Sequence, residues 1–465
     1  MVILDTTIIN IALESLRRDL HTTLGGVQWV VTGYILAIAV MVPLTGWAAR
    51  RIGAKRLFLI SMAVFTLGSA LCGLARSPWQ LILFRVVQGL GGGAIVPVGQ
   101  MILVRVAGPS NLPRVMAAYG VPTILAPVFG PTLGGLLLAN ASWRWIFYIN
   151  VPIGVFALVR GLGKLPAEPP QIAGPLDLAG LGLVASGLVG LTYGLSQVGS
   201  SSNGLSHVAI PVVAGVVLVV VFVLRALHIE RPLLNMRLYT NRIFAAASLT
   251  TFLLSSVLIG AAILMPLYYQ TIRHLNTLST GLLVAPRGIG ATLGTWVSRR
   301  MMERFGTGAT TAIGVLLTLL FSVPFLLLGS HTSYVLISTV LTLQGFGIGL
   351  TITPAITAGY RAVKPDQIND ATPQQNIVQR VGSSIGTAIL LSLLQHYLAH
   401  AGTSTSAQAR AFGTTFGWLL AIGTVAMFAA AYLFALERRQ ARSLSTNATV
   451  DADLVEAAES LVPEG

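Results

Sequence analysis

Residues 81–93 read LILFRVVQGLGGG and place one arginine in the middle of an apolar, glycine-rich segment. A guanidinium does not lose its proton in a protein, and burying it at bilayer depth is costly unless a polar interior receives it. Residues three, four and seven positions apart lie on one helix face, and here that face holds Arg85, Gln88, Gly89 and Gly92. Because glycine has no side chain, this face leaves room for a neighbouring helix or a water-filled cavity close to the arginine. The stretch therefore predicts a transporter core rather than a membrane anchor.

The composition of the chain is that of a polytopic membrane protein. Its 465 residues are 54% hydrophobic and 9% charged, whereas soluble domains carry about 25% charged residues. The single cysteine, Cys72, lies in an apolar segment and has no partner for a disulfide, so core packing is favoured over a redox role. No signal peptide with a cleavage site precedes the first apolar segment.

Fourteen apolar stretches recur along the chain with short polar gaps between them. Most of them reach the roughly 20 residues that a helix needs to cross the hydrocarbon core. We therefore predict an all-α polytopic membrane protein with fourteen spans, at residues 1–16, 27–49, 57–75, 79–104, 115–140, 145–165, 176–198, 207–227, 242–269, 280–298, 309–328, 334–360, 376–399 and 412–436.

Basic residues give the orientation. When alternate loops are assigned to opposite sides, 20 of the 29 lysines and arginines fall on one side and six on the other. Cytoplasmic loops carry the excess of basic residues, so both termini are predicted to be cytoplasmic. The net charge of +14 then reflects topology, and we expect no nucleic-acid partner.

The chain repeats itself at a nearly constant offset. Residues 88–93 recur at 344–349, residues 51–53 recur at 304–306, and Gly130 and Gly134 match Gly382 and Gly386. Two six-span halves with two inserted spans explain these echoes, as in transporters built from parallel repeats. We expect an N-terminal half at 1–165, the inserted pair at 166–237, a C-terminal half at 238–436 and a disordered cytoplasmic tail at 437–465. The same offset would start the first span about ten residues before Met1, so we expect the recorded start to be late or clipped.

One carboxylate and one arginine are candidates for proton coupling. Asp5 is the only acid well inside a predicted span, and desolvation there would let it take a proton on one side and release it on the other. Arg85 would be its electrostatic counterpart. The alternatives are an interfacial Asp5 and an Arg85 that only fixes helix packing. The repeat places Leu258 and Leu341 at the matching positions, which favours a functional role for both charges.

Other candidates for the site are small, aromatic or polar. Gly130, Pro131, Gly134 and Gly135 in the fifth span predict close helix contact and a hinge, with a static kink as the alternative. Gly89 and Gly92 are predicted packing positions. A binding cavity could be lined by some of these residues, although interfacial or packing roles stay open for most: Trp29, Tyr34, Gln88, Gln100, Tyr268, Tyr269, Arg287 and Gln344.

The sequence contains no motif for enzymatic or ATP-driven chemistry. We find no metal-ligand cluster, no phosphate-binding loop and no nucleophile elbow. We therefore expect no enzyme activity, no cofactor and no metal. The driving force would come from an ion gradient.

These residues resemble the major facilitator superfamily, and specifically its fourteen-span drug:proton antiporter family. The resemblance rests on Leu4-Asp5-Thr6-Thr7, on the Arg85–Gly93 stretch, on Gly130-Pro131 with Gly134-Gly135, and on the run from Trp143 to Gly154. It implies the major facilitator fold, proton coupling at Asp5 and proton transfer at Arg85. The loop motif of the family matches Gly46, Arg50, Arg51, Gly53 and Lys55. Arg50 stands where that motif often has aspartate, which removes an acidic partner implied to latch the inward gate and leaves the gating role of the loop open.

We therefore expect a proton-coupled antiporter in the inner (cytoplasmic) membrane that exports amphipathic or hydrophobic small molecules. A dedicated exporter of one endogenous lipid, siderophore or self-made antibiotic is the first alternative. A non-transporting scaffold or sensor with an acidic tail is a remote one. The lipid bilayer and a small-molecule substrate are the expected partners, and an accessory envelope protein stays open.

Overall fold

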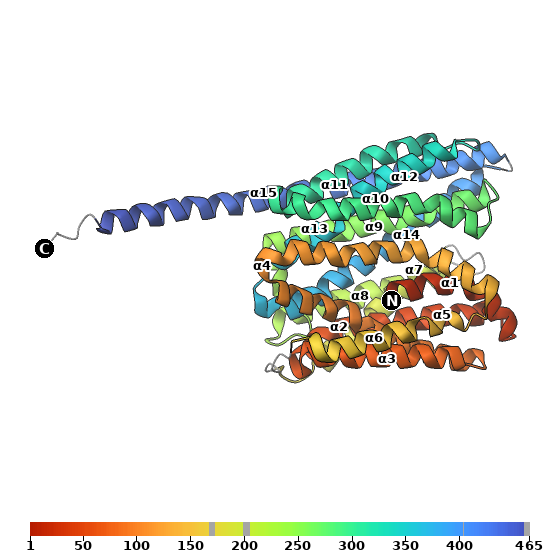
Figure 1. The fold of residues 1–465 in the computed structure, drawn as a ribbon, viewed down its shortest axis with the longest axis horizontal. Helices are drawn as coiled ribbons and strands as arrows, with labels where there is room; N and C mark the ends of the chain where they lie inside the picture. Colours follow the sequence, from red (N-terminus) through yellow and green to blue (C-terminus); the bar gives the residue numbers. More distant parts are fainter. Residues whose placement is uncertain (167–172, 199–204, 403, 460–465) are drawn as a thin grey trace.

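The computed structural model describes the backbone of residues 1–166, 173–198, 205–402 and 404–459, and these residues form helices without strands (Figure 1). The first part of the chain contains α1 (Val2–Asp19), α2 (Leu24–Ile52), α3 (Ala54–Leu74), α4 (Pro78–Asn140), α5 (Trp145–Tyr148), α6 (Asn150–Lys164), α7 (Leu178–Ser196) and α8 (Leu205–His228). The second part contains η1 (Met236–Thr240), α9 (Arg242–Thr271), α10 (Thr277–Phe305), α11 (Thr307–Ser322), η2 (Val323–Leu327), α12 (Tyr334–Gly349), α13 (Ile352–Arg361), η3 (Pro365–Gln367), α14 (Ile368–His400) and α15 (Thr405–Glu459).

Polar residues at the ends of the apolar runs explain where several helices begin. The side chains of Thr23, Ser77 and Asn276 accept hydrogen bonds from backbone N–H groups of the first turns of α2, α4 and α10. Helix N-termini leave four N–H groups without intrahelical partners, and such caps satisfy one of them. Between the caps the helix satisfies its own backbone, as hydrocarbon requires.

The element α4 consists of two helices that meet at Gly108. This glycine has φ 64° and ψ 173°, which no helical residue adopts. Glycine reaches positive φ without a steric penalty. The break falls between the fourth and fifth predicted spans, so these two predicted spans correspond to the parts of α4 before and after Gly108.

Among the described residues, eleven helices are long and apolar enough to cross a membrane. The other three predicted spans correspond to α1, to the part of α4 after Gly108 and to α10. Charged residues such as Asp5, Glu14 and Arg17 lower the hydropathy of α1. The predicted all-α polytopic class is confirmed, and the total of fourteen spans stays a prediction.

The helices pack as two groups with a helix pair beside them. Figure 1 shows α1 to α6 in the lower part of the molecule and α9 to α13 in the upper part. The groups meet where α4 packs against α10 and where α14 packs against α2 and α4. These contacts position the site that follows, because α2 and α4 belong both to the site and to the seam between the groups.

The inserted helices α7 and α8 form a hairpin that packs against α2 and α14. Asp177 caps α7 by accepting from the Gly180 N–H at 2.8 Å, and the same carboxylate accepts two hydrogen bonds from Arg225 of α8 at 2.7 and 2.8 Å. Trp47 of α2 donates to the Gly174 carbonyl at 3.2 Å. One carboxylate therefore starts the first helix of the pair and ties it to the second.

The last helix is long. Helix α15 continues to Glu459 and extends away from the bundle (Figure 1). Residues 437–459 contain no glycine or proline, the residues that most strongly interrupt helices. The disorder expected for the tail stays a prediction. Residues 460–465 lie outside the described part.

Candidate functional site

Asp5 and Arg85 form a direct, fully buried ion pair. The Arg85 Nη1 atom lies 2.6 Å from Asp5 Oδ2, and both side chains are 0% exposed. Arg85 Nε also donates to the Val30 carbonyl of α2 at 3.2 Å, and Nη1 donates to Gln88 Oε1 at 2.9 Å. The sequence predicted Arg85 as the electrostatic counterpart of Asp5, and the structure places the two side chains in direct contact.

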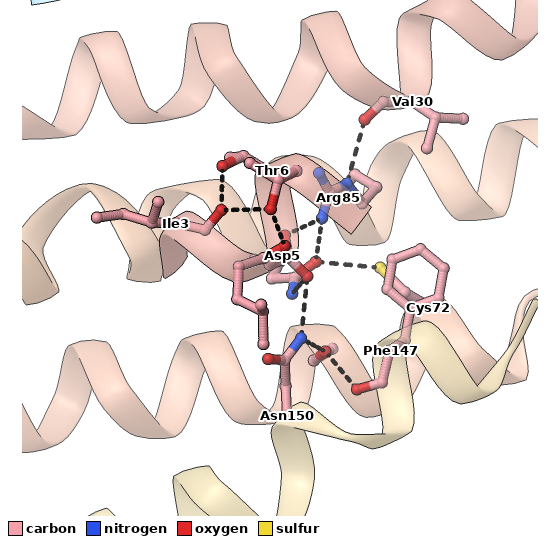
Figure 2. A network of polar contacts seen from close by, with 12 residues as sticks. Ile3, Asp5, Thr6, Val30, Cys72, Arg85, Phe147 and Asn150 are labelled. Atoms are coloured by element: carbon pink, nitrogen blue, oxygen red, sulfur yellow. Dashed lines mark hydrogen bonds and ion pairs between the residues drawn. The ribbon is translucent and has the colours of Figure 1, made fainter. Parts of the chain in front are cut away.

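The second oxygen of Asp5 is held by two amides. Asp5 Oδ1 accepts from Gln88 Nε2 and from Asn150 Nδ2, both at 3.0 Å. Asn150 also donates to the Ser69 hydroxyl at 3.2 Å, and that hydroxyl donates to the Phe147 carbonyl at 2.9 Å. Figure 2 shows the carboxylate between Arg85 on one side and Asn150 on the other. Three helices, α1, α4 and α6, therefore meet at one carboxylate, and Asn150 extends the contact to Ser69 of α3.

An aromatic side chain covers the other face of the arginine. The Arg85 Cζ atom lies 3.9 Å from the centroid of the Tyr34 ring, within the range of a cation–π contact. Three buried polar atoms of this cluster make no hydrogen bond within the described residues: the Tyr34 hydroxyl, Arg85 Nη2 and Asn150 Oδ1. The cluster therefore keeps hydrogen-bonding capacity beyond the contacts that it already makes.

The glycines within residues 81–93 let the neighbouring helices approach α4. A Cβ atom at Gly89 would lie 2.6 Å from the Tyr34 carbonyl oxygen, and one at Gly91 would lie 2.5 Å from the Phe65 backbone nitrogen. A Cβ atom at Gly92 would meet the Tyr34 hydroxyl at 3.1 Å. Gly91, which the sequence reasoning did not select, is thus as tightly packed as Gly89.

The fifth-span glycines have different surroundings from one another. A Cβ atom at Gly130 would collide with the Thr7 hydroxyl, so this glycine lets α4 approach α1 two residues from Asp5. Gly134 is buried, whereas a Cβ atom at Gly135 would meet nothing within 4 Å. The side chain of Pro131 lies outside the described residues, and the hinge stays a prediction.

Most of the predicted cavity residues do not gather around the ion pair. Only Tyr34 and Gln88 contact it. Gln100 accepts from Asn376 at 2.7 Å and from Tyr360 at 3.1 Å, so it joins α4 to the C-terminal half. The others lie apart: Trp29 stacks on Tyr193, Tyr268 donates to the Gly329 carbonyl and packs with Tyr269 in an apolar core, Gln344 donates to Ser322, and Arg287 donates to the Leu258 carbonyl.

The loop with the altered motif forms an ion pair with the other half of the chain. Arg50 Nη1 lies 2.8 Å from Asp370 Oδ1 of α14, and both side chains are largely buried at 19% and 14% exposure. A Cβ atom at Gly46 would lie 2.5 Å from the Asn369 carbonyl oxygen. The loop itself lacks the acid of the motif, and its basic replacement Arg50 instead pairs with an acid of the other half of the chain. The gating role of the loop stays a prediction.

The remaining loop residues have local roles. Lys55 donates to the carbonyls of Leu162 and Leu165 at 3.0 and 2.7 Å, which ties the start of α3 to the end of α6. Gly53 separates α2 from α3 with φ 85°, a conformation that favours glycine. Arg51 is exposed.

Sequence reasoning missed several polar residues that complete these contacts. Asn150 lies inside the run from Trp143 to Gly154, where an amide in an apolar segment was a usable signal. Ser69 and Asp370 gave no comparable signal, since their roles depend on contacts across 81 and 320 residues.

Comparison with known proteins places this chain among membrane transporters. A family model described as "Major Facilitator Superfamily" matches residues 1–387. The "Multidrug resistance protein B homolog" of Mycobacterium tuberculosis is 38% identical over 407 residues, covering 85% of this chain and 74% of that protein. The "Putative multidrug resistance protein MdtD" of Escherichia coli is 31% identical over 414 residues, covering 86% of each.

A solved structure is similar in fold. The human organic anion transporter MFSD10 (TETRAN) superposes with a TM-score of 0.62 over 92% of this chain and 96% of that chain. The sequence identity is 18%, so this likeness concerns the fold alone.

Proposed function

Because this chain belongs to the Major Facilitator Superfamily and is a multi-pass membrane transporter, we propose that it exchanges protons for amphipathic or hydrophobic small molecules, which it exports across the cytoplasmic membrane. The proposal includes fourteen spans and two cytoplasmic termini, as the apolar pattern and the basic loops favour. The names of the relatives that are multidrug resistance proteins support the export of such compounds. The observation that carries the proposal is the buried Asp5–Arg85 pair.

A proton on the carboxylate removes the charge that pairs with Arg85. Charged Asp5 accepts from Arg85, Gln88 and Asn150. Protonation removes its charge and turns one acceptor oxygen into a donor, so Arg85 becomes an unpaired buried charge. Such a charge is strongly unfavourable. Helices α1, α4 and α6 must then rearrange or admit water, which couples proton binding to a change of conformation.

The contacts at the seam between the halves would change during transport. Arg50 with Asp370, and Gln100 with Asn376, close the halves at the end that the basic loops assign to the cytoplasm. Opening toward the cytoplasm would break these contacts, and opening toward the other side would keep them. Rocking of the halves around this seam is the alternating-access motion of such folds.

Transport in proteoliposomes tests the proposal. With an imposed pH gradient, the wild type should move an amphipathic substrate, whereas Asp5→Asn should lose the gradient-driven component while it remains folded. Asparagine keeps the shape of aspartate but cannot carry the proton. Glu14→Gln on the same helix is the matched control, because Glu14 is an exposed acid paired with Arg17, and it should transport like the wild type. Gradient-driven transport by Asp5→Asn at the wild-type rate would refute the coupling role.

A further inference from the structure

The C-terminal half carries an arginine at the seam that the coupling scheme does not use. Arg380 lies in the middle of α14 and is partly buried. None of the described acidic side chains forms an ion pair with it, and its guanidinium donates no hydrogen bond to the described residues. Arg85 has Asp5 and Arg50 has Asp370. Arg380 therefore brings an uncompensated positive charge into the membrane region.

Neighbouring residues on α14 place Arg380 toward the N-terminal half. Asn376, four positions earlier, donates to Gln100 of α4. Ile377, three positions earlier, packs against the apolar cluster that contains Tyr34 of α2. Residues three and four apart share a helix face. Arg380 thus lies one helical turn after the residues of α14 that contact the N-terminal half.

The N-terminal half presents a hydrogen-bond donor to this charge. The apolar cluster that contains Tyr34 packs against Ile377, which lies three residues before Arg380 on α14. The Tyr34 hydroxyl is buried and makes no hydrogen bond within the described residues. A guanidinium without an acid and a phenol without a partner are two donors that one anionic group would satisfy together.

Arg287, in the same half as Arg380, differs from it in its hydrogen bonding. It is also buried and has no acidic partner among the described residues, but its Nη2 donates to the Leu258 carbonyl of its own half. The repeat offset of 253 relates Arg287 to Tyr34, since 34 plus 253 is 287. Arg287 therefore belongs to the packing between α9 and α10, whereas Arg380 belongs to the seam.

We propose that Arg380 and Tyr34 form an anion-binding subsite, so that the exported compounds include amphipathic anions such as carboxylates. This inference rests on the proposed export function and names a substrate class for it. The ring of Tyr34 covers Arg85, while its hydroxyl makes no hydrogen bond within the described residues and is left to bind the anion. One side chain thus connects the proton site with the substrate site. Export of an anion and entry of a proton both move positive charge inward, so an inside-negative membrane potential drives both.

Equilibrium binding to the purified full-length chain tests the subsite without any proton gradient. The probes are pyrenebutyrate and its neutral analogue pyrenebutanol. The wild type should prefer the anion by about tenfold, as hydrogen bonds to charged groups allow. Arg380→Gln should abolish this preference while the affinity for pyrenebutanol stays unchanged, which also shows that the variant is folded. Arg380→Lys should keep part of the preference, and Tyr34→Phe should reduce it.

Two controls separate this inference from the proposed function. Arg287→Gln removes a buried charge away from the seam and should keep the full preference; an equal loss there would mean a general charge effect and overturn the subsite. Asp5→Asn should bind pyrenebutyrate normally yet fail to transport it with a pH gradient. The inference would be refuted if Arg380→Gln prefers the anion as strongly as the wild type does, or if it loses affinity for both probes equally. Either result would refute it even if Asp5 proves essential for transport.

Discussion

At the scale of single residues, one buried carboxylate is the centre of the candidate site. Asp5 accepts from three side chains, and the arginine among them is covered by an aromatic ring. A buried ion pair is weak evidence for stability, because the desolvation of both ions offsets their attraction. The pair is therefore better explained by function than by folding energy.

This view predicts an asymmetric response to leucine substitutions. Arg85→Leu leaves the Asp5 charge buried without its partner and should lower the free energy of unfolding by about 3–5 kcal/mol. The double variant Asp5→Leu with Arg85→Leu should recover much of that loss, because the repeat already has Leu258 and Leu341 at both matching positions. Thermal unfolding in detergent measures both variants. A double variant less stable than either single one would contradict the prediction.

The sequence made part of this cluster predictable. An acid and an arginine inside apolar spans could be assigned to one interior, since each is too costly to face lipid. Their direct contact could not be predicted, nor could the amide of Asn150, because both depend on how far apart the helices pack. The glycines indicated close packing but did not identify which neighbour each one meets.

At the scale of helices, α4 is the element around which the N-terminal half packs. Its glycines bring α2 and α3 within backbone contact, and Gly130 brings α1 against its second part. Apolar burial drives little helix association in lipid, so close backbone approach matters more there. The sequence predicted this use of glycine. It also predicted the break in α4, because one apolar stretch ends at residue 104 and the next begins at residue 115.

Two alanine substitutions in α4 should therefore have different effects on the free energy of unfolding. Gly91→Ala places a Cβ atom 2.5 Å from the Phe65 nitrogen, and backbone cannot move aside as a side chain can. Such overpacking costs about 1–3 kcal/mol. Gly135→Ala meets nothing within 4 Å and should be neutral or stabilise by up to about 1 kcal/mol, as expected for alanine in a helix. Unfolding curves of both variants check this; equal losses would argue against glycine packing as the cause.

At the scale of the whole molecule, the closed seam depends on residues that are far apart in the chain. Arg50 and Asp370 are 320 positions apart, and Arg105 with Asn369 are 264 apart. The internal repeat predicted two halves, but no pattern within either half indicates which residues meet across the seam. The replacement of the motif's aspartate by Arg50 is visible in the sequence, whereas its pairing with Asp370 of α14 is visible only in the structure.

The exchange of charges between Arg50 and Asp370 tests this seam. Arg50→Asp should repel Asp370 and open the end that the basic loops assign to the cytoplasm, which is measurable as faster thiol labelling of a cysteine introduced inside the seam. Cys72 is buried and is replaced by serine in all variants. Arg50→Asp with Asp370→Arg should close the seam again only in part, because Asp370 lies in the first turn of α14, where the helix dipole favours an acid. Labelling that does not change in Arg50→Asp would exclude a latch at this pair.

The central claim is that the proton exchanged for substrate binds at Asp5, so that substrate binding and release of this proton are linked. The most direct measurement adds a compound that the wild type exports to weakly buffered, purified protein and records the pH of the solution. The account predicts that the wild type releases protons on binding and that Asp5→Asn binds the same compound without releasing any. Proton release of equal size from both proteins would contradict it.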